Sequence, residues 1–321
     1  MDQSTIDQVS KTQQVSDNEA RANLIVDPEV LSLDGDAVVS RVKPSSGEDK
    51  GAAEGKSSEG DMQHHIFNLS FSNRLSLAPI SSSDLERKHF LDIGTGTGIW
   101  AVEFAKAHPE AQVLGFDISV CNPASKPNNT GFVIQDAEST PWPFTQKFYY
   151  IHGRAMMSCF NDAGKVICEA YEKLEPGGWL ELQDVIAPWT DVDGSLLGSK
   201  LLEFHTNTIE AALSVGRDVK QVIKYPSLFV AAGFQEISEF HYQWPIGAWA
   251  KDEKLKKIGE MFRDDLDQTM EPIAERLFGL VKKMPRKEID DLVREARRDL
   301  FDVKRIRGYM PGLVVYGRKP L

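Results

Sequence analysis

Residues able to bind a ligand are concentrated in the stretch LDIGTGTGIWAVEFA, where Gly94, Gly96 and Gly98 lie between two apolar runs. Asp92 precedes the first glycine by two residues, and Asp117 closes the second apolar run. Glycine permits positive φ angles and lets a ligand approach the backbone closely. A helix that starts after such a turn directs its free N–H groups and the positive end of its dipole toward the same place. The spacing predicts a binding site for a carboxylate, a phosphate or the polar edge of a ribose.

The acids around this turn narrow the choice of ligand. A turn built only for a pyrophosphate gains nothing from the negative charge of Asp92, whereas a ligand with an ammonium or sulfonium group is attracted by it. Asp117 is placed to accept hydrogen bonds from both hydroxyls of a ribose. Asp136 follows a third apolar run in QDAE, where it can meet the exocyclic amine of an adenine. Together the three acids favour S-adenosylmethionine over a dinucleotide.

His152 is the candidate catalytic residue, because it stands at the end of the fourth apolar run in YIHGR and histidine exchanges a proton near neutral pH. The alternative is a structural histidine bonded to a turn. A general base is needed only if the methyl acceptor is neutral, such as a hydroxyl. Arg154 can orient an acidic substrate or cap the segment that follows, and Asp184 is expected to face the same crevice.

No metal site is predicted. His64 and His65 are adjacent and lack a third ligand at a suitable spacing. One of them can touch the carboxylate of the cofactor, and the other is expected to be packed or solvated. The three cysteines show neither metal-ligand spacing nor a disulfide pattern, which is typical of a reducing compartment.

Alternating strands and helices must position these residues. Strands are expected at 88–94, 111–118, 130–137, 148–153 and 179–185, with helices at 97–108 and 162–174. Short, continuously apolar strands separated by helices are typical of a parallel sheet covered on both faces, which is an α/β fold. The remaining chain predicts helices at 195–216 and 222–232, a strand at 234–244, three amphipathic pieces within 250–305 and a last strand at 312–319.

The composition is that of an acidic globular protein. The 321 residues carry a formal net charge of −11, and 41% of them are hydrophobic. A uniformly acidic protein repels phosphate backbones, and the basic residues of 251–307 are interleaved with acids, so nucleic acid is not an expected partner. No apolar run reaches membrane-spanning length and no secretory signal is visible, so no membrane partner is expected. A cytoplasmic location is predicted, with the nucleus as the alternative.

The N-terminal segment differs from the rest of the chain. Residues 1–60 contain no Phe, Trp or Tyr and are rich in Ser, Asp, Gln, Gly and Lys, a composition that predicts a disordered tail. Such a tail suits binding to a protein partner. A folded domain is expected over 61–321, starting with a short helix at Asp61. Helical insertions are predicted at about 190–220 and 250–305, where an acceptor pocket can form.

These motifs, in this order, resemble those of class I S-adenosylmethionine-dependent methyltransferases. The resemblance rests on LDIGTGTGIWAVEFA, GFDIS, QDAE, EPGGWLELQD and VVYGRKP. The segments DMQHHIFNLSFSNRLSLAPI and QWPIGAWAKD are similar to those of the LaeA-like fungal family. The chain departs from that pattern because no Tyr-containing segment precedes QHH. From about Asp61 onward, the resemblance implies a Rossmann-like, doubly wound sheet of seven strands, with an antiparallel final strand and a helical cap.

By position in these motifs, the resemblance implies S-adenosyl-L-methionine as the cofactor and assigns residues to it. The assigned residues are Asp92, Gly94, Thr95, Gly96, Gly98, Asp117, Ile118, Asp136, Ala137 and His152. The expected function is methylation of an oxygen or nitrogen of a small-molecule acceptor in fungal secondary metabolism. The alternatives are a LaeA-like regulatory or scaffold protein, and an enzyme of this fold that catalyses a reaction other than methyl transfer. A nicotinamide-dependent dehydrogenase is the weakest alternative.

Overall fold

The computed structural model of the chain describes residues 59–80 and 88–321. The predicted disordered tail, 1–60, lies outside these residues except for its last two positions, which belong to helix α2 (Glu59–Ser70). The chain divides into two compact units. We call the described residues up to Ile186, with Ile209–Phe240 and Leu313–Leu321, the sheet unit, and Ala187–Thr208 with His241–Gly312 the helical unit. The extent of the domain over 61–321 stays a prediction.

An eight-stranded sheet organises the fold, in the strand order β3-β2-β1-β4-β5-β8-β6 with β7 paired to β8. The strands are β1 His89–Ile93, β2 Gln112–Asp117, β3 Thr130–Ile134, β4 Phe148–Arg154, β5 Leu174–Val185, β6 Thr190–Asp191, β7 Gln235–Pro245 and β8 Gly308–Arg318. The pairs β1–β2, β1–β4, β2–β3 and β4–β5 are all parallel. The predicted α/β doubly wound fold is confirmed. One detail is corrected: the sheet has eight strands rather than seven, because the two-residue β6 pairs with β8.

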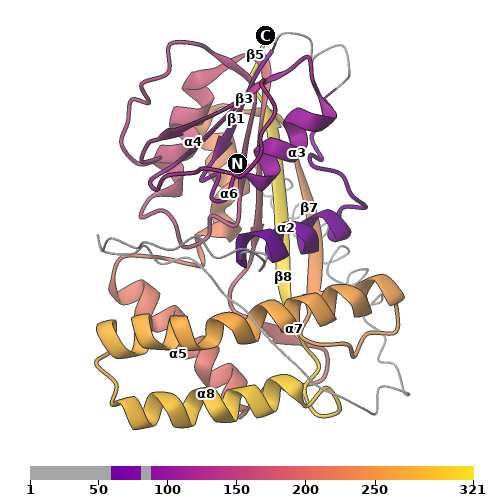
Figure 1. The fold of residues 1–321 in the computed structure, drawn as a ribbon, viewed down its shortest axis with the longest axis vertical. Coiled ribbons are helices and arrows are strands. Elements are labelled where there is room, and N and C mark those ends of the chain that lie inside the picture. The colour runs from indigo at the N-terminus through magenta and orange to yellow at the C-terminus, as the bar shows by residue number, and fades with distance from the viewer. Residues whose placement is uncertain (1–58, 81–87) are drawn as a thin grey trace, which may run out of the picture. The chain divides into compact units, whose positions relative to one another are not determined.

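Neighbouring residues of the central strands pack on opposite faces of the sheet. Phe90 of β1 belongs to a buried cluster with residues of helix α3 (Ile99–Ala107). The next residue, Leu91, belongs to a second cluster with residues of α4 (Ala163–Lys173) and α6 (Tyr225–Ala232). Figure 1 shows α3 on one side of these strands and α4 on the other. Both faces of the sheet are therefore covered, as its continuously apolar strands predict.

Local sequence explains where the helices of the sheet unit begin. Helix α3 begins at Ile99 rather than at Thr97, because Gly98 before it has a left-handed φ of 80°. Helix α4 follows Asp162, whose side chain accepts a hydrogen bond from the backbone N–H of Lys165. The sequence EPGG was predicted to lie between this helix and a strand, and it lies instead within β5.

The helical unit contains the predicted amphipathic pieces. They are α7 Glu253–Ile273, the π-helical segment η3 Ala274–Val281 and α8 Arg286–Phe301. Asp252 caps α7 by accepting a hydrogen bond from the N–H of Leu255. Helix α5 (Lys200–Ser214) starts in this unit, where the Asp299 carboxylate accepts a hydrogen bond from the N–H of Lys200. None of the helices in the described part of the chain is both long and apolar enough to span a membrane.

Candidate functional site

The glycine loop joins the end of β1 to the start of α3. Gly94, Gly96 and Gly98 have left-handed backbone conformations, with φ of 61°, 59° and 80°, which glycine adopts without a steric penalty. A side chain at Gly94 would be strained by this φ, and its Cβ would lie 2.6 Å from the Cε methyl of Met156, which would have to shift. The loop therefore forms a tight turn, and Met156 packs directly on its first glycine.

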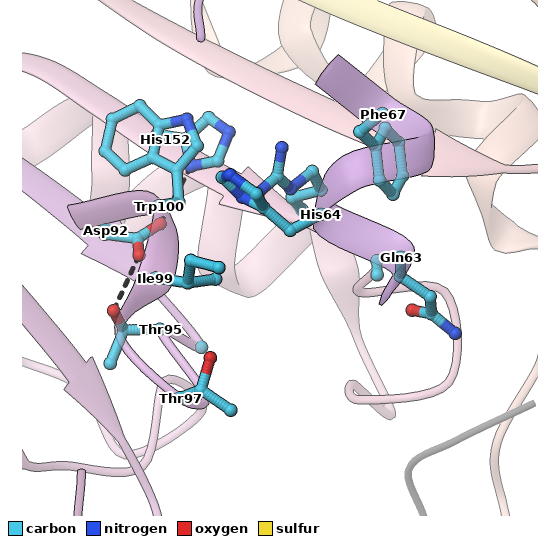
Figure 2. A pocket seen from close by; sticks show the side chains of 12 residues that line it. Gln63, His64, Phe67, Asp92, Thr95, Thr97, Ile99, Trp100 and His152 are labelled. Atoms are coloured by element: carbon cyan, nitrogen blue, oxygen red, sulfur yellow. Dashed lines mark hydrogen bonds and ion pairs between the residues drawn. The ribbon is translucent and has the colours of Figure 1, made fainter. Parts of the chain in front are cut away.

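A pocket lies beside this loop within the sheet unit (Figure 2). Residues of α2, the end of β1, the glycine loop, the first turn of α3 and the end of β4 line it: Gln63, His64, Phe67, Asp92, Gly94, Thr95, Thr97, Ile99, Trp100, His152, Arg154 and Ala155. Because the carboxyl ends of β1 and β4 meet here, the pocket stands where open α/β sheets bind their ligands.

Asp92 and His152 form a buried pair in the wall of the pocket. They are register partners on the adjacent parallel strands β1 and β4, and His152 Nδ1 lies 2.8 Å from Asp92 Oδ1. The other carboxylate oxygen, Oδ2, accepts a 2.6 Å hydrogen bond from the Thr95 hydroxyl, drawn as a dashed line in Figure 2. The Trp100 ring stacks on the imidazole, with centroids 3.8 Å apart. His152 has no exposed surface, and its Nε2 has no hydrogen-bond partner among the described residues.

This arrangement distinguishes the two nitrogens of the His152 ring. An ionised carboxylate only accepts hydrogen bonds, so we assign the proton of the neutral ring to Nδ1 and leave Nε2 as an acceptor. A buried acceptor without a partner costs about 1–3 kcal/mol. A ligand in this pocket that donates a hydrogen bond to Nε2 would remove that cost.

Helix α2 closes one side of the pocket through side-chain hydrogen bonds. The Thr97 hydroxyl donates to Asp61 at 3.0 Å, and His64 Nε2 lies 2.8 Å from a carboxylate oxygen of Glu103. Arg154 donates to His64 Nδ1. Because arginine only donates, Nδ1 is the acceptor and Nε2 carries the proton. Burial, with the charge of Arg154 second, lowers the pKa of His64 to about 4, so the ring is neutral at neutral pH.

Asp117 stands at the end of β2, where the sequence analysis placed it, and contacts the glycine loop. One carboxylate oxygen accepts a 3.1 Å hydrogen bond from the N–H of Gly96, and the other accepts from the N–H and the hydroxyl of Ser119. Asp117 does not line the pocket. Its carboxylate stabilises the loop, and its proposed contact with a ribose stays a prediction.

Only some of the predicted binding residues line the pocket. Those that do not line the pocket are Gly96, Gly98, Asp117, Ile118, Asp136 and Ala137. Asp136 is exposed and accepts a 2.9 Å hydrogen bond from the N–H of Glu138. Ala137 packs in the hydrophobic core, and its carbonyl accepts from the indole N–H of Trp142. The predicted residues brought together in the pocket are Asp92, Gly94, Thr95 and His152.

Glu181 on β5 is a buried carboxylate with many donors and no surface exposure. It accepts hydrogen bonds of 2.9 Å and 2.7 Å from the backbone N–H groups of Leu77 and Ala78. The Tyr150 hydroxyl and the Gln183 amide also donate to it, at 3.0 Å and 2.7 Å. Glu181 therefore holds Leu77 and Ala78 against the sheet.

Asp184 on the same strand is also buried, with 1% of its surface exposed. It accepts hydrogen bonds from the N–H of Met156 at 2.9 Å, the N–H of Val185 at 3.0 Å and the hydroxyl of Tyr225 at 3.0 Å. The expectation that Asp184 faces the crevice is wrong, because it does not line the pocket. Its side chain instead ties β5 to the segment after β4 and to α6.

Several pocket residues were not predicted from the sequence, among them Phe67 and Trp100. Trp100 stands two residues after the last glycine, in the first turn of the helix, and a large ring at that position can reach back over the strand ends. This position of Trp100 after the last glycine could have identified it as a pocket residue from the sequence. Among residues 59–80 and 88–321, no three or more His, Cys, Asp or Glu side chains are grouped to hold a metal ion.

A family model described as a methyltransferase domain matches residues 62–239, which is more than half of the chain. This chain belongs to the methyltransferase domain family. The methyltransferase is 35% identical over 220 residues to methyltransferase pytC of Aspergillus terreus, covering 68% of this chain and 67% of pytC. It is 32% identical over 268 residues to the probable methyltransferase tdiE of Emericella nidulans, covering 81% of this chain and 80% of tdiE.

The methyltransferase is also similar to a regulator of secondary metabolism. It is 28% identical over 269 residues to the protein-methionine methyltransferase laeA of Emericella nidulans, covering 81% of this chain and 69% of laeA. A solved structure of Haemonchus contortus phosphoethanolamine N-methyltransferase 2 with S-adenosyl-L-methionine matches with a TM-score of 0.47 at 17% identity, covering 81% of this chain and 53% of that chain. The predicted membership of the LaeA-like fungal methyltransferases is confirmed by the family match and the fungal relatives.

Proposed function

We propose that this methyltransferase binds S-adenosyl-L-methionine in the pocket beside the glycine loop and methylates an oxygen or nitrogen of a small-molecule acceptor. The observation that carries the proposal is the buried pair of Asp92 and His152, which places a carboxylate and an unpartnered imidazole nitrogen in one pocket at the carboxyl ends of β1 and β4. The family match supports methyl transfer as the reaction.

The side chains of the pocket fit the charges of this cofactor. Asp92 supplies a negative charge that attracts an ammonium or sulfonium group. Arg154 also lines the pocket and attracts a carboxylate. Asp117 and Asp136, at the ends of β2 and β3, remain the proposed partners of the ribose and the adenine.

The chain's part in the reaction is mainly to position the acceptor and exclude water. The bound cofactor supplies a methyl group made electrophilic by its sulfonium. Holding a nucleophile in line with such a group can lower the barrier by about 7–11 kcal/mol. Helix α2 contributes by covering the pocket, with the side chains of His64 and Phe67 buried in its wall.

His152 is proposed to take the proton of an acceptor that is neutral before reaction. Its Nε2 is the free acceptor, and Asp92 holds Nδ1–H and stabilises the imidazolium that results, as the acid does in other acid–histidine pairs. The stacked Trp100 ring fixes the plane of the imidazole. General-base catalysis of this kind contributes about 10²–10⁴-fold to the rate. An acceptor that is already anionic would not need it.

Calorimetric titration with S-adenosylhomocysteine tests the cofactor site. Asp117→Ala is expected to lower the affinity about tenfold or more, because hydrogen bonds to a charged group contribute about 1.5–3 kcal/mol each. Asp218→Ala is the matched control, since Asp218 belongs to the same unit, pairs with Lys224 at 2.9 Å and does not line the pocket. Absence of binding to the wild type at millimolar ligand contradicts the proposal. Unchanged affinity in Asp117→Ala removes only the ribose assignment.

Regulation is the second candidate function, because a relative 28% identical to this chain is named secondary metabolism regulator laeA. Incubation with methyl-labelled S-adenosylmethionine and a fungal small-molecule extract distinguishes regulation from methylation of a small molecule. Label in an extracted product, with the mass gain of one methylene unit, supports methylation of a small molecule. A product without that mass gain indicates a different reaction on the same fold. A stable protein partner with no labelled product supports regulation. The predicted role of the tail in partner binding lies outside the described residues.

A further inference from the structure

Asp184 is a buried acid that the proposed reaction does not use, yet it is linked to the pocket through Met156. We propose that Asp184 is a positioning residue of the cofactor site, and that its ionised carboxylate raises cofactor affinity by holding Met156 against Gly94. The inference rests on the proposed function, because it concerns the affinity of that pocket for S-adenosylmethionine and its demethylated product.

The surroundings of Asp184 supply hydrogen-bond donors within an apolar core. Leu180 and Leu182, at alternate positions of β5, belong to the hydrophobic core that also contains Tyr225. The partners of the Asp184 carboxylate include the backbone N–H groups of Met156 and Val185 and the Tyr225 hydroxyl. All of these can donate to a carboxylate. A protonated Asp184 has only the Tyr225 oxygen among them as an acceptor for its own proton, so protonation must rearrange these hydrogen bonds.

Both forms of Asp184 are populated near neutral pH. Burial raises the pKa of Asp184 to about 7, although the hydrogen bonds from Val185, Tyr225 and Met156 act in the opposite direction. Of the described residues, the titratable groups that face it are Tyr225 of α6 and, next to Tyr225, Cys159. Burial and the neighbouring Asp184 raise the pKa of Tyr225, so the phenol stays protonated.

The link to the pocket runs through the segment that follows β4. The N–H of Met156 donates to Asp184, and the sulfur and methyl of Met156 occupy the space that a side chain at Gly94 would need. Ala155, the residue before Met156, lines the pocket and has a left-handed φ of 56°. Gly94 lines the same pocket. A change in the hydrogen bond at Met156 therefore reaches two neighbouring parts of the pocket wall.

Linkage gives the direction of the effect. If the ionised form favours the binding-competent loop, cofactor binding must in turn lower the pKa of Asp184. A decrease of about half a unit to one unit corresponds to an affinity that rises about three- to tenfold as the pH increases through 7. A purely structural role for Asp184 would instead change the affinity by the same factor at every pH.

The test is the dissociation constant of S-adenosylhomocysteine, measured by calorimetry from about pH 6 to about pH 8.5, a range that spans neutrality. Wild type is expected to show the three- to tenfold rise in affinity, and Asp184→Asn is expected to show no rise. Tyr225→Phe removes one donor from the carboxylate, raises the Asp184 pKa further and should move the midpoint of the rise to higher pH. Both variants keep every histidine of the pocket, so any pH dependence from those histidines is common to all three proteins.

Asp218→Asn is the control variant and should keep the wild-type profile, because the Asp218 carboxylate accepts hydrogen bonds from Lys220 and Lys224 and makes no hydrogen bond to Met156. A wild-type profile in Asp184→Asn overturns the inference, and so does an equal loss of affinity at every pH. If Asp184→Asn does not fold, Tyr225→Phe decides: an unmoved midpoint overturns the inference and a shift to higher pH supports it. A wild type that binds no S-adenosylhomocysteine at any pH contradicts the proposed function itself, whereas binding with an unaltered profile in the variants contradicts only the role of Asp184.

Discussion

Asp92 and Asp184 are both buried at the carboxyl ends of parallel strands, yet their surroundings differ. Asp92 is paired with the imidazole of His152 and lines the pocket. Asp184 is surrounded by neutral donors and apolar side chains, and it lies outside the pocket. A buried acid is tolerated either when it is paired or when it can become neutral. Asp92 is the paired acid, and Asp184, whose pKa is raised by burial, is the acid that can become neutral.

The comparison is tested first by removing the His152 imidazole from its pair with Asp92, which should change the free energy of unfolding more than the other substitutions. His152→Ala removes a hydrogen-bond donor from the buried Asp92 carboxylate and leaves a cavity beside Trp100, and together these changes cost about 3–5 kcal/mol of unfolding free energy. Urea unfolding measures the loss. His205→Ala is the matched control, because His205 is also buried and stacked on a tryptophan, with centroids 4.0 Å apart. An equal loss in both variants would show that the contact with Asp92 adds nothing.

The second prediction concerns the pH dependence of stability at Asp184. Burial raises its pKa from 3.8 to about 7 in the folded protein. Between these values the folded state holds a proton that the unfolded state has released, so the contribution of Asp184 is present below about pH 4 and lost as the pH rises to about 7. The loss amounts to up to about 4 kcal/mol, at about 1.4 kcal/mol per unit. Asp184→Asn should remove this decline from urea unfolding measured across that range.

The third prediction concerns His64, whose contribution to stability should change with pH in the opposite direction to that of Asp184. The pKa of His64 is lowered from 6.5 to about 4 by burial first and by Arg154 second. The unfolded state therefore binds the extra proton, and the contribution of His64 is present above about pH 6.5 and lost as the pH falls toward about 4, by up to about 3.5 kcal/mol. His64→Gln should reduce the loss of stability on acidification. A wild-type acid profile in this variant would show that His64 does not titrate as described.

The smallest expected effect follows from removing one neutral donor. Tyr225→Phe deletes a single hydrogen bond to Asp184 and keeps the ring in the core. The unfolding free energy near pH 8 should fall by about 1 kcal/mol, the usual net contribution of such a bond. Tyr171→Phe provides a comparison on a half-buried tyrosine that makes ring contacts with Phe234. A loss of unfolding free energy above about 3 kcal/mol would contradict this prediction, because it would equal the cost of breaking a buried ion pair.

Much of the fold could be predicted from the chain's periodicity. Continuous apolar runs at 88–94, 111–118 and 148–153 correspond to β1, β2 and β4, and the glycines between the first two mark the turn into α3. Strand order and register are a different matter, because they depend on contacts between distant segments. That is why the alignment of Asp92 with His152, 60 residues later, could not be derived from spacing alone.

Part of the candidate site could also be predicted from the sequence. An acid before the glycines and a histidine after the fourth strand could be proposed from their positions at strand ends. The roles of Trp100 and Met156 depend on side-chain packing, which cannot be predicted from the periodicity of the sequence. Asp184 was expected in the crevice because it ends a strand, but alternation along β5 directs it into the core instead.

The hydrogen bonds from Leu77 and Ala78 to Glu181 limit how far the protein can be truncated from its N-terminus. A fragment that starts at β1 would remove two backbone donors that the Glu181 carboxylate has in the whole chain. A fragment that starts at Glu59 keeps these donors and also the side chains of α2 that line the pocket. Expression trials for crystallisation should therefore place the first residue at or before position 59.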